Sequence, residues 1–216
     1  MTGPALSLRI GVLASGEGTN LQALLDACHE GRINGHIALM LTNNPQAGAI
    51  ARCKRADVPF AVVDHRDFPK REDFDAVLVE KLRAARIDLV VLAGFMRIIS
   101  PVLINAFAQR IMNIHPSLLP AFPGKGPQRQ ALEHGVRFSG CTVHFVDTGV
   151  DTGPIILQAV VPVHANDDVE ALKRRIQEQE HHIYPQAVQL FAQGRLALDG
   201  RRVTILPEAS ALPDSF

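Results

Sequence analysis

The feature that most constrains the fold of this chain is an alternation of apolar and amphipathic segments over residues 8–100. The apolar segments 8–14, 36–41, 60–63 and 88–93 have the length and continuity of buried parallel strands. Between them, apolar residues recur at helical spacing. The helices expected there span 21–28, 47–56 and 70–86. This order predicts βαβ units, and therefore an α/β fold, a doubly wound, mostly parallel sheet with flanking helices.

The pattern changes after residue 100, where the elements become more varied. In chain order, we expect a strand at 110–113, a helix at 127–134, strands at 140–146 and 155–163, a helix at 167–192 and a hairpin of strands 196–198 and 203–206. The two middle strands are expected to pair antiparallel before the long helix. No repeat or low-complexity linker interrupts the chain, so residues 1–216 are expected to form a single domain.

Composition narrows the class of function. The 22 basic and 22 acidic residues cancel, so no overall field attracts nucleic acid or an anionic membrane. The three cysteines are far apart and form no CxxC, which argues against a disulfide framework or a thiolate zinc site. The N-terminus lacks the pattern of a signal peptide, and no apolar run approaches the roughly 20 residues that span a bilayer. We expect a cytoplasmic protein.

A glycine-rich loop, Gly16-Glu17-Gly18-Thr19-Asn20, follows the first strand and leads into the first helix. Two glycines let backbone N–H groups approach a ligand, and the helix N-terminus favours an anion such as phosphate. The loop matches neither a Walker A motif nor the dinucleotide fingerprint. The alternative is a tight turn in which Thr19 or Asn20 caps the helix.

Asn113 and His115 lie two residues apart at the end of a strand, in the segment Asn-Ile-His-Pro-Ser-Leu-Leu-Pro. On extended backbone both side chains point to the same side. The prolines at 116 and 120 stiffen the chain, which suits preorganised hydrogen-bond donors. The alternative is that His115 has only a structural role.

The segment from Asp147 to Pro154 is rich in aspartate and glycine. It is either a solvated turn between strands or the source of a carboxylate that keeps a nearby imidazole protonated. No metal site is expected, because His181 and His182 are helix neighbours that face apart. The apolar segment 93–99 belongs to the core by default, yet it follows the most apolar strand, where a flat ring could bind.

Together these segments identify the chain as similar to the phosphoribosylglycinamide formyltransferase family, folate-dependent enzymes of purine synthesis. The resemblance extends from Leu8 to about Leu206. It is carried by six segments: 15–23, 92–98, 113–120, 142–146, 151–156 and 179–181. It implies an acceptor-phosphate half at about 8–100 and a folate and catalytic half at about 101–206.

The resemblance also assigns roles to single residues. Those implied to be catalytic are Asn113, His115 and Asp151. Those implied to bind the acceptor are Gly18, Thr19 and Asn20 at the phosphate and Glu180 at the ribose. Those implied to bind folate are Arg71, Met96, Arg97, Ile98, Ile99, Asn113, Asp147, Thr148, Gly149 and Val150.

The implied reaction is direct attack of the glycinamide amine on the formyl carbon of 10-formyltetrahydrofolate. Asn113 and a protonated His115 would donate hydrogen bonds to the oxyanion, and His115 or a water held by Asp151 would transfer protons. The folate is a co-substrate, and no metal or tightly bound cofactor is implied. The expected partners are these two small molecules, with the chain a monomer or homodimer.

Two departures and three alternatives qualify the resemblance. Many relatives carry a histidine within the turn at 124–128, where this chain has none, and some carry a cation where this chain has Gln177. Methionyl-tRNA formyltransferases add a C-terminal domain and formyltetrahydrofolate hydrolases an N-terminal one, and the length of this chain leaves room for neither. A catalytically silent folate-binding protein is the third alternative, against which the intact Asn113, His115 and Asp151 argue.

Overall fold

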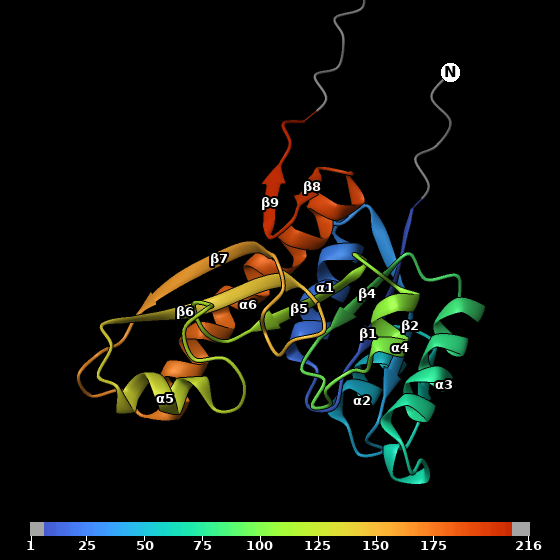
Figure 1. The fold of residues 1–216 in the computed structure, drawn as a ribbon, viewed down its shortest axis with the longest axis horizontal. Helices are drawn as coiled ribbons and strands as arrows, with labels where there is room; N and C mark the ends of the chain where they lie inside the picture. Colours follow the sequence, from blue (N-terminus) through green and yellow to red (C-terminus); the bar gives the residue numbers. More distant parts are fainter. Residues whose placement is uncertain (1–6, 209–216) are drawn as a thin grey trace, which may run out of the picture.

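A computed structural model describes residues 7–208 of the chain. They form one nine-stranded sheet in the order β3-β2-β1-β4-β5-β6-β7-β9-β8, with helices on both faces (Figure 1). The strands are β1 (Leu8–Leu13), β2 (Gly35–Thr42), β3 (Phe60–Val62), β4 (Leu89–Leu92), β5 (Ile111–His115), β6 (Phe138–Phe145), β7 (Ile155–Pro162), β8 (Leu196–Asp199) and β9 (Arg202–Ile205). The helices are α1 (Thr19–His29), α2 (Gly48–Arg55), the 3-10 helix η1 (His65–Asp67), α3 (Arg71–Ala84), α4 (Pro101–Ala106), α5 (Pro127–Glu133) and α6 (Val169–Ala192).

The five strands from β1 to β5 are all parallel, as the alternating pattern predicts. The chain builds outward from β1 to β2 and β3, and then crosses to β4 and β5 on the other side of β1. The strand order therefore reverses between β1 and β4. In open α/β sheets, ligands bind beyond the carboxyl ends of the strands at such a switch point.

The remaining strands extend the sheet in a mixed pattern. Strand β6 pairs antiparallel with β5, and β7 pairs antiparallel with β6. The terminal hairpin of β8 and β9 joins β7 only through Ile155 and Arg202. Asp168 caps α6 by accepting a hydrogen bond from the backbone N–H of Ala171 at 2.7 Å.

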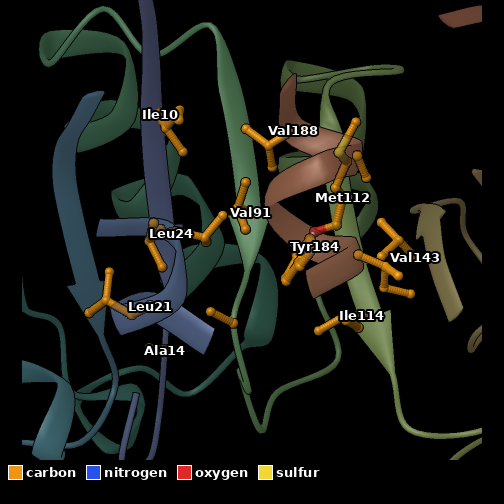
Figure 2. Close-up of a cluster of buried hydrophobic side chains, with 14 of the residues drawn as sticks. Ile10, Ala14, Leu21, Leu24, Val91, Met112, Ile114, Val143, Tyr184 and Val188 are labelled. Carbon is orange, nitrogen blue, oxygen red and sulfur yellow. The ribbon is translucent and has the colours of Figure 1, made fainter. Parts of the chain in front are cut away.

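Two apolar clusters hold the helices against the sheet. On one face, α1 and α6 cover β1, β4 and β5, and on the other face α3 and α4 cover them. Figure 2 shows Leu24 of α1 near Val91 of β4 and Tyr184 of α6 near Met112 of β5, while Leu21 of α1 lies beside Ala14. The Tyr184 hydroxyl lies 2.9 Å from the Leu92 carbonyl oxygen and 3.0 Å from that of Met112, so α6 is fixed to both central strands.

The predicted fold class is confirmed, and the elements lie within a few residues of their expected positions. Helix α4 was not predicted, although Ser100-Pro101 is a typical helix start with proline at the first position. The 3-10 helix η1 was also missed, since three residues carry no periodicity. Strand β5 runs two residues further than expected and includes His115. Within residues 7–208, no helix is long and apolar enough to cross a bilayer.

Candidate active site

Three strand ends place the predicted site residues at one edge of the sheet. Because β1, β4 and β5 are parallel neighbours, the segments that follow them emerge on the same side. These segments are the glycine-rich loop 15–20, the loop 93–100, and the end of β5 with Asn113 and His115. The sheet thus brings the acceptor loop and the catalytic strand end to a common edge.

Among the three predicted catalytic residues, Asp151 lies within hydrogen-bonding reach of both His115 and Asn113. His115 Nδ1 lies 3.2 Å from one carboxylate oxygen of Asp151, and Asn113 Nδ2 lies 3.4 Å from the other. His115 is 5% exposed, and Asn113 pairs with His144 on the adjacent strand β6. Residues that are 38 positions apart in the chain therefore form one cluster.

Both ring nitrogens of His115 face oxygen atoms that only accept hydrogen bonds in this arrangement. Nδ1 faces the Asp151 carboxylate, and Nε2 lies 2.9 Å from the backbone carbonyl oxygen of Phe122. A neutral imidazole has one N–H and can donate to only one of them, whereas the protonated ring donates to both. Only a ring with an N–H at both positions would therefore satisfy both oxygen atoms.

A second histidine, His144, lies beside Asn113 and completes the cluster. Its Nδ1 lies 2.8 Å from the Phe145 carbonyl oxygen, so Nδ1 carries the proton and Nε2 accepts from Asn113 Nδ2 at 3.1 Å. Burial lowers the pKa of His144, which favours the neutral ring. His144 was not predicted as a site residue, and only its place in a strand beside β5 could have suggested it.

Asp151 connects this cluster to a segment far away in the sequence. The carboxylate oxygen that faces His115 also accepts a hydrogen bond from the Gly124 backbone N–H at 2.8 Å. Its backbone has φ 55°, a left-handed conformation that aspartate adopts more readily than most residues. Within the same loop, Asp147 accepts from the Gly149 N–H and the Thr152 hydroxyl. The segment 147–152 is thus a defined turn that aims Asp151 at His115.

The glycine-rich loop has the geometry expected of an anion site. Helix α1 begins at Thr19, and Gly18 precedes it with φ 72° and no side-chain cap, so the alternative of a cap by Thr19 or Asn20 is wrong. A Cβ at position 18 would lie 2.9 Å from Ala49. Gln177 of α6 donates to the Thr19 hydroxyl oxygen at 2.7 Å, and that hydroxyl can still donate to a ligand.

Glu180 lies next to this loop on α6. Asn20 Nδ2 donates to its carboxylate at 2.8 Å, and the side chain of Glu180 is buried. Burial raises the pKa of Glu180, because desolvation disfavours the charged carboxylate. The predicted acceptor residues Thr19 and Asn20 of α1 therefore lie beside α6, where Thr19 contacts Gln177 and Asn20 contacts Glu180.

The predicted folate residues are divided between exposed and buried positions. Met96 and Ile98 are 77% and 61% exposed, and Val150 is 48% exposed. These are large apolar side chains in loops at the edge that bears the catalytic cluster, where apolar surface favours a flat ligand. Ile99 instead packs in the core with α3 and α4. Arg71 begins α3 and lies near Glu72, 3.6 Å away.

The arrangement offers donors for a developing negative charge but no metal cluster. Within residues 7–208, no three His, Cys, Asp or Glu side chains are grouped so as to hold a metal ion. The cluster holds an imidazole, an amide and a carboxylate, and the start of α1, which has no side-chain cap, lies at the same edge. Such a set suits acyl transfer with oxyanion stabilisation.

A family model described as formyl transferase matches residues 8–188. The chain belongs to the formyl transferase family. This formyltransferase is 42% identical to phosphoribosylglycinamide formyltransferase of Haemophilus influenzae over 207 residues, 96% of this chain and 97% of that protein. It is similar to the crystal structure of glycinamide ribonucleotide transformylase 1 from Symbiobacterium toebii, with a TM-score of 0.94, 56% identity and coverage of 96% and 98% of the two chains.

The formyltransferase also matches part of much longer proteins. It is 47% identical to the trifunctional purine biosynthetic protein adenosine-3 of Drosophila melanogaster over 188 residues. That match covers 86% of this chain and 14% of the Drosophila protein. The predicted family is therefore confirmed.

Proposed function

We propose that this formyltransferase moves the formyl group of 10-formyltetrahydrofolate onto the amine of 5-phosphoribosylglycinamide, a step of de novo purine biosynthesis. The observation that carries the proposal is the contact of His115 and Asn113 with Asp151, at the edge where the anion-binding end of α1 also lies. The names of relatives that match nearly the whole chain support the same substrates.

In the proposed reaction, the glycinamide amine attacks the formyl carbon directly. Negative charge develops on the formyl oxygen, and Asn113 and the charged His115 donate hydrogen bonds to it. Asn113 Nδ2 lies 3.1 Å from His144 Nε2 and 3.4 Å from Asp151. The N–H that faces Asp151 makes the longer contact, so it is the one available to the oxyanion. His144 keeps the other N–H and so fixes the orientation of the amide.

His115 must exchange a partner to take part. Its Nε2 lies 2.9 Å from the Phe122 carbonyl oxygen, and in the reaction the formyl oxygen replaces that acceptor. Asp151 stays on Nδ1 and stabilises the ring while it is charged. The bond between the formyl carbon and the folate nitrogen then breaks; that nitrogen gains a proton and the amine loses one, through His115 or a water held by Asp151. The folate is a co-substrate, and the steps need no metal or tightly bound cofactor.

The two substrates occupy different parts of the edge. The acceptor's phosphate lies on the N–H groups of Gly18, Thr19 and Asn20, and Glu180 contacts its ribose. The pterin lies against the loop of Met96, Arg97 and Ile98 and the turn from Asp147 to Val150, with Ile99 supporting that loop from the core and Arg71 near the folate tail. Holding both substrates in line contributes to the rate independently of acid or base catalysis. The partners are small molecules, and the enzyme acts as a monomer or homodimer.

The test is to follow the folate absorbance of 10-formyltetrahydrofolate with the purified protein, with and without 5-phosphoribosylglycinamide. We expect the formyl group to leave the folate only when the acceptor is present. Glycinamide riboside, which lacks the phosphate, is the matched control and should react far more slowly at equal concentration. Equal turnover without acceptor would identify a hydrolase, and folate binding without turnover would identify a silent binding protein; either result would overturn the proposal.

A further inference from the structure

Ser15 lies where the sheet reverses its strand order. It lies two residues after the end of β1, and its backbone N–H donates to the Gly94 carbonyl oxygen at 3.1 Å, two residues after the end of β4. This contact joins the start of the glycine-rich loop to the loop 93–100, which carries the exposed Met96 and Ile98. Ser15 is itself buried, at 8% exposure, so we expect it to support the loops of the site from the protein interior rather than to contact a ligand.

The Ser15 hydroxyl makes a second link to the same loop. It accepts a hydrogen bond from the Met96 backbone N–H at 2.8 Å and donates one to Asn43 Oδ1 at 2.6 Å. Asn43 follows β2 and is also buried. One hydroxyl thus uses its donor and an acceptor site to connect the ends of β1, β2 and β4.

The far end of the loop 93–100 is anchored separately. The Ser100 backbone N–H donates to the carboxylate of Asp75, a buried residue of α3. Burial raises the pKa of Asp75, as expected for a carboxyl group with little contact with water. Between the two anchors, Met96, Arg97 and Ile98 lie exposed. The loop is therefore held at both ends and presents its middle to solvent.

We propose that Ser15 is a positioning residue for folate. Its hydroxyl fixes the Met96 backbone and so holds the loop 93–100, where folate binds, in a defined position relative to the glycine-rich loop 15–20. This inference rests on the proposed function, because it needs folate to bind along residues 96–98. A neutral hydrogen bond contributes modestly to stability, so its loss should change affinity by roughly fivefold rather than abolish binding. Substitution of Ser15 should therefore raise the KM for folate and leave kcat, which reports on the chemical step, nearly unchanged.

Two measurements on Ser15→Ala test this inference. The first is hydrogen exchange of the Met96 amide by NMR, which should become faster because its acceptor is gone. The second is steady-state kinetics, in which the KM for 10-formyltetrahydrofolate should rise on the order of fivefold, with kcat and the KM for the acceptor within about twofold. Ser139→Ala is the matched control, since Ser139 is 2% exposed and its hydroxyl has no hydrogen-bond partner within residues 7–208.

Unchanged Met96 exchange in Ser15→Ala would overturn the inference, and so would faster exchange with an unchanged KM for folate. A fall in kcat with both KM values unchanged would also overturn it. If Ser15→Ala does not fold, Ser15→Cys keeps the volume and replaces the oxygen with a weaker acceptor. Failure of the proposed function looks different: the wild-type protein transfers no formyl group to the acceptor, whereas Met96 exchange still decides whether Ser15 holds the loop.

Discussion

The acceptor end and the catalytic end of the site are built in different ways. At the acceptor end, a loop and the N-terminus of α1 present backbone N–H groups, and the residues that supply them, Ser15 to Asn20, are contiguous in the chain. At the catalytic end, side chains from β5, β6 and the turn at 147–152 meet only because β6 pairs antiparallel with β5. The first end depends on local backbone geometry, and the second depends on contacts across the sheet.

This difference predicts which kinetic constants respond to substitution. If the loop binds the acceptor as proposed, changes there should affect binding, because backbone donors would hold the phosphate equally in the ground and transition states. Changes at the cluster of Asn113, His115 and Asp151 should affect turnover, because charge on the formyl oxygen develops only in the transition state.

The largest expected effect is on His115→Ala. The substitution removes a charged donor to the oxyanion, and kcat should fall on the order of a hundredfold or more. Binding of folate and acceptor, measured by calorimetry, should stay near the wild-type level, because other residues form those sites. A loss of less than about tenfold in single-turnover rate would mean that His115 has a structural role.

A smaller effect is expected on Gly18→Ala. The added Cβ would lie 2.9 Å from Ala49 and would occupy a backbone with φ 72°, so the loop must move. Acceptor affinity should fall roughly tenfold or more, with folate affinity unchanged. Gly16→Ala is the matched control, because a Cβ there has nothing within 4 Å. Equal effects of the two substitutions, or a loss of folate binding with acceptor binding kept, would contradict the assignment.

The smallest expected effect is that of His144→Gln on the pH dependence of stability. Burial lowers the pKa of His144 below its ordinary value of 6.5. Protonation is thus easier in the unfolded chain, so stability is lost as the pH falls below 6.5 toward the lowered pKa. In His144→Gln, the free energy of unfolding should fall less steeply over this window, by at most about 1.4 kcal/mol per pH unit for one proton. Urea unfolding at several pH values measures the slopes, and parallel slopes would exclude the effect.

The fold and much of the site could be predicted from the sequence because their signals are local. Strand and helix periods gave the parallel half, and the spacing of Asn113 and His115 on a strand placed both side chains on one side, as the structure confirms. The antiparallel pairing of the strands before the long helix is also confirmed. Helix α4 was missed because six residues give too few turns for a clear period.

Other site features depend on contacts that no local pattern encodes. His144 reads as an ordinary strand residue, and only the register of β6 against β5 places it beside Asn113. The Phe122 carbonyl and the Gly124 N–H are backbone atoms with no residue-type signal, yet they contact His115 and Asp151. The family resemblance assigns Ile99 to the folate pocket, whereas its side chain packs in the core.

A double-mutant cycle on His115 and Asp151 tests most directly the central claim that the sheet makes these two residues one catalytic unit. We expect Asp151→Asn alone to lower kcat tenfold or more, and His115→Ala alone to lower it further. If Asp151 acts through His115, the double variant should have a kcat within about threefold of that of His115→Ala, since residues that act as a unit are not additive. Losses that multiply in the double variant would show that Asp151 acts independently of His115 and would contradict the account.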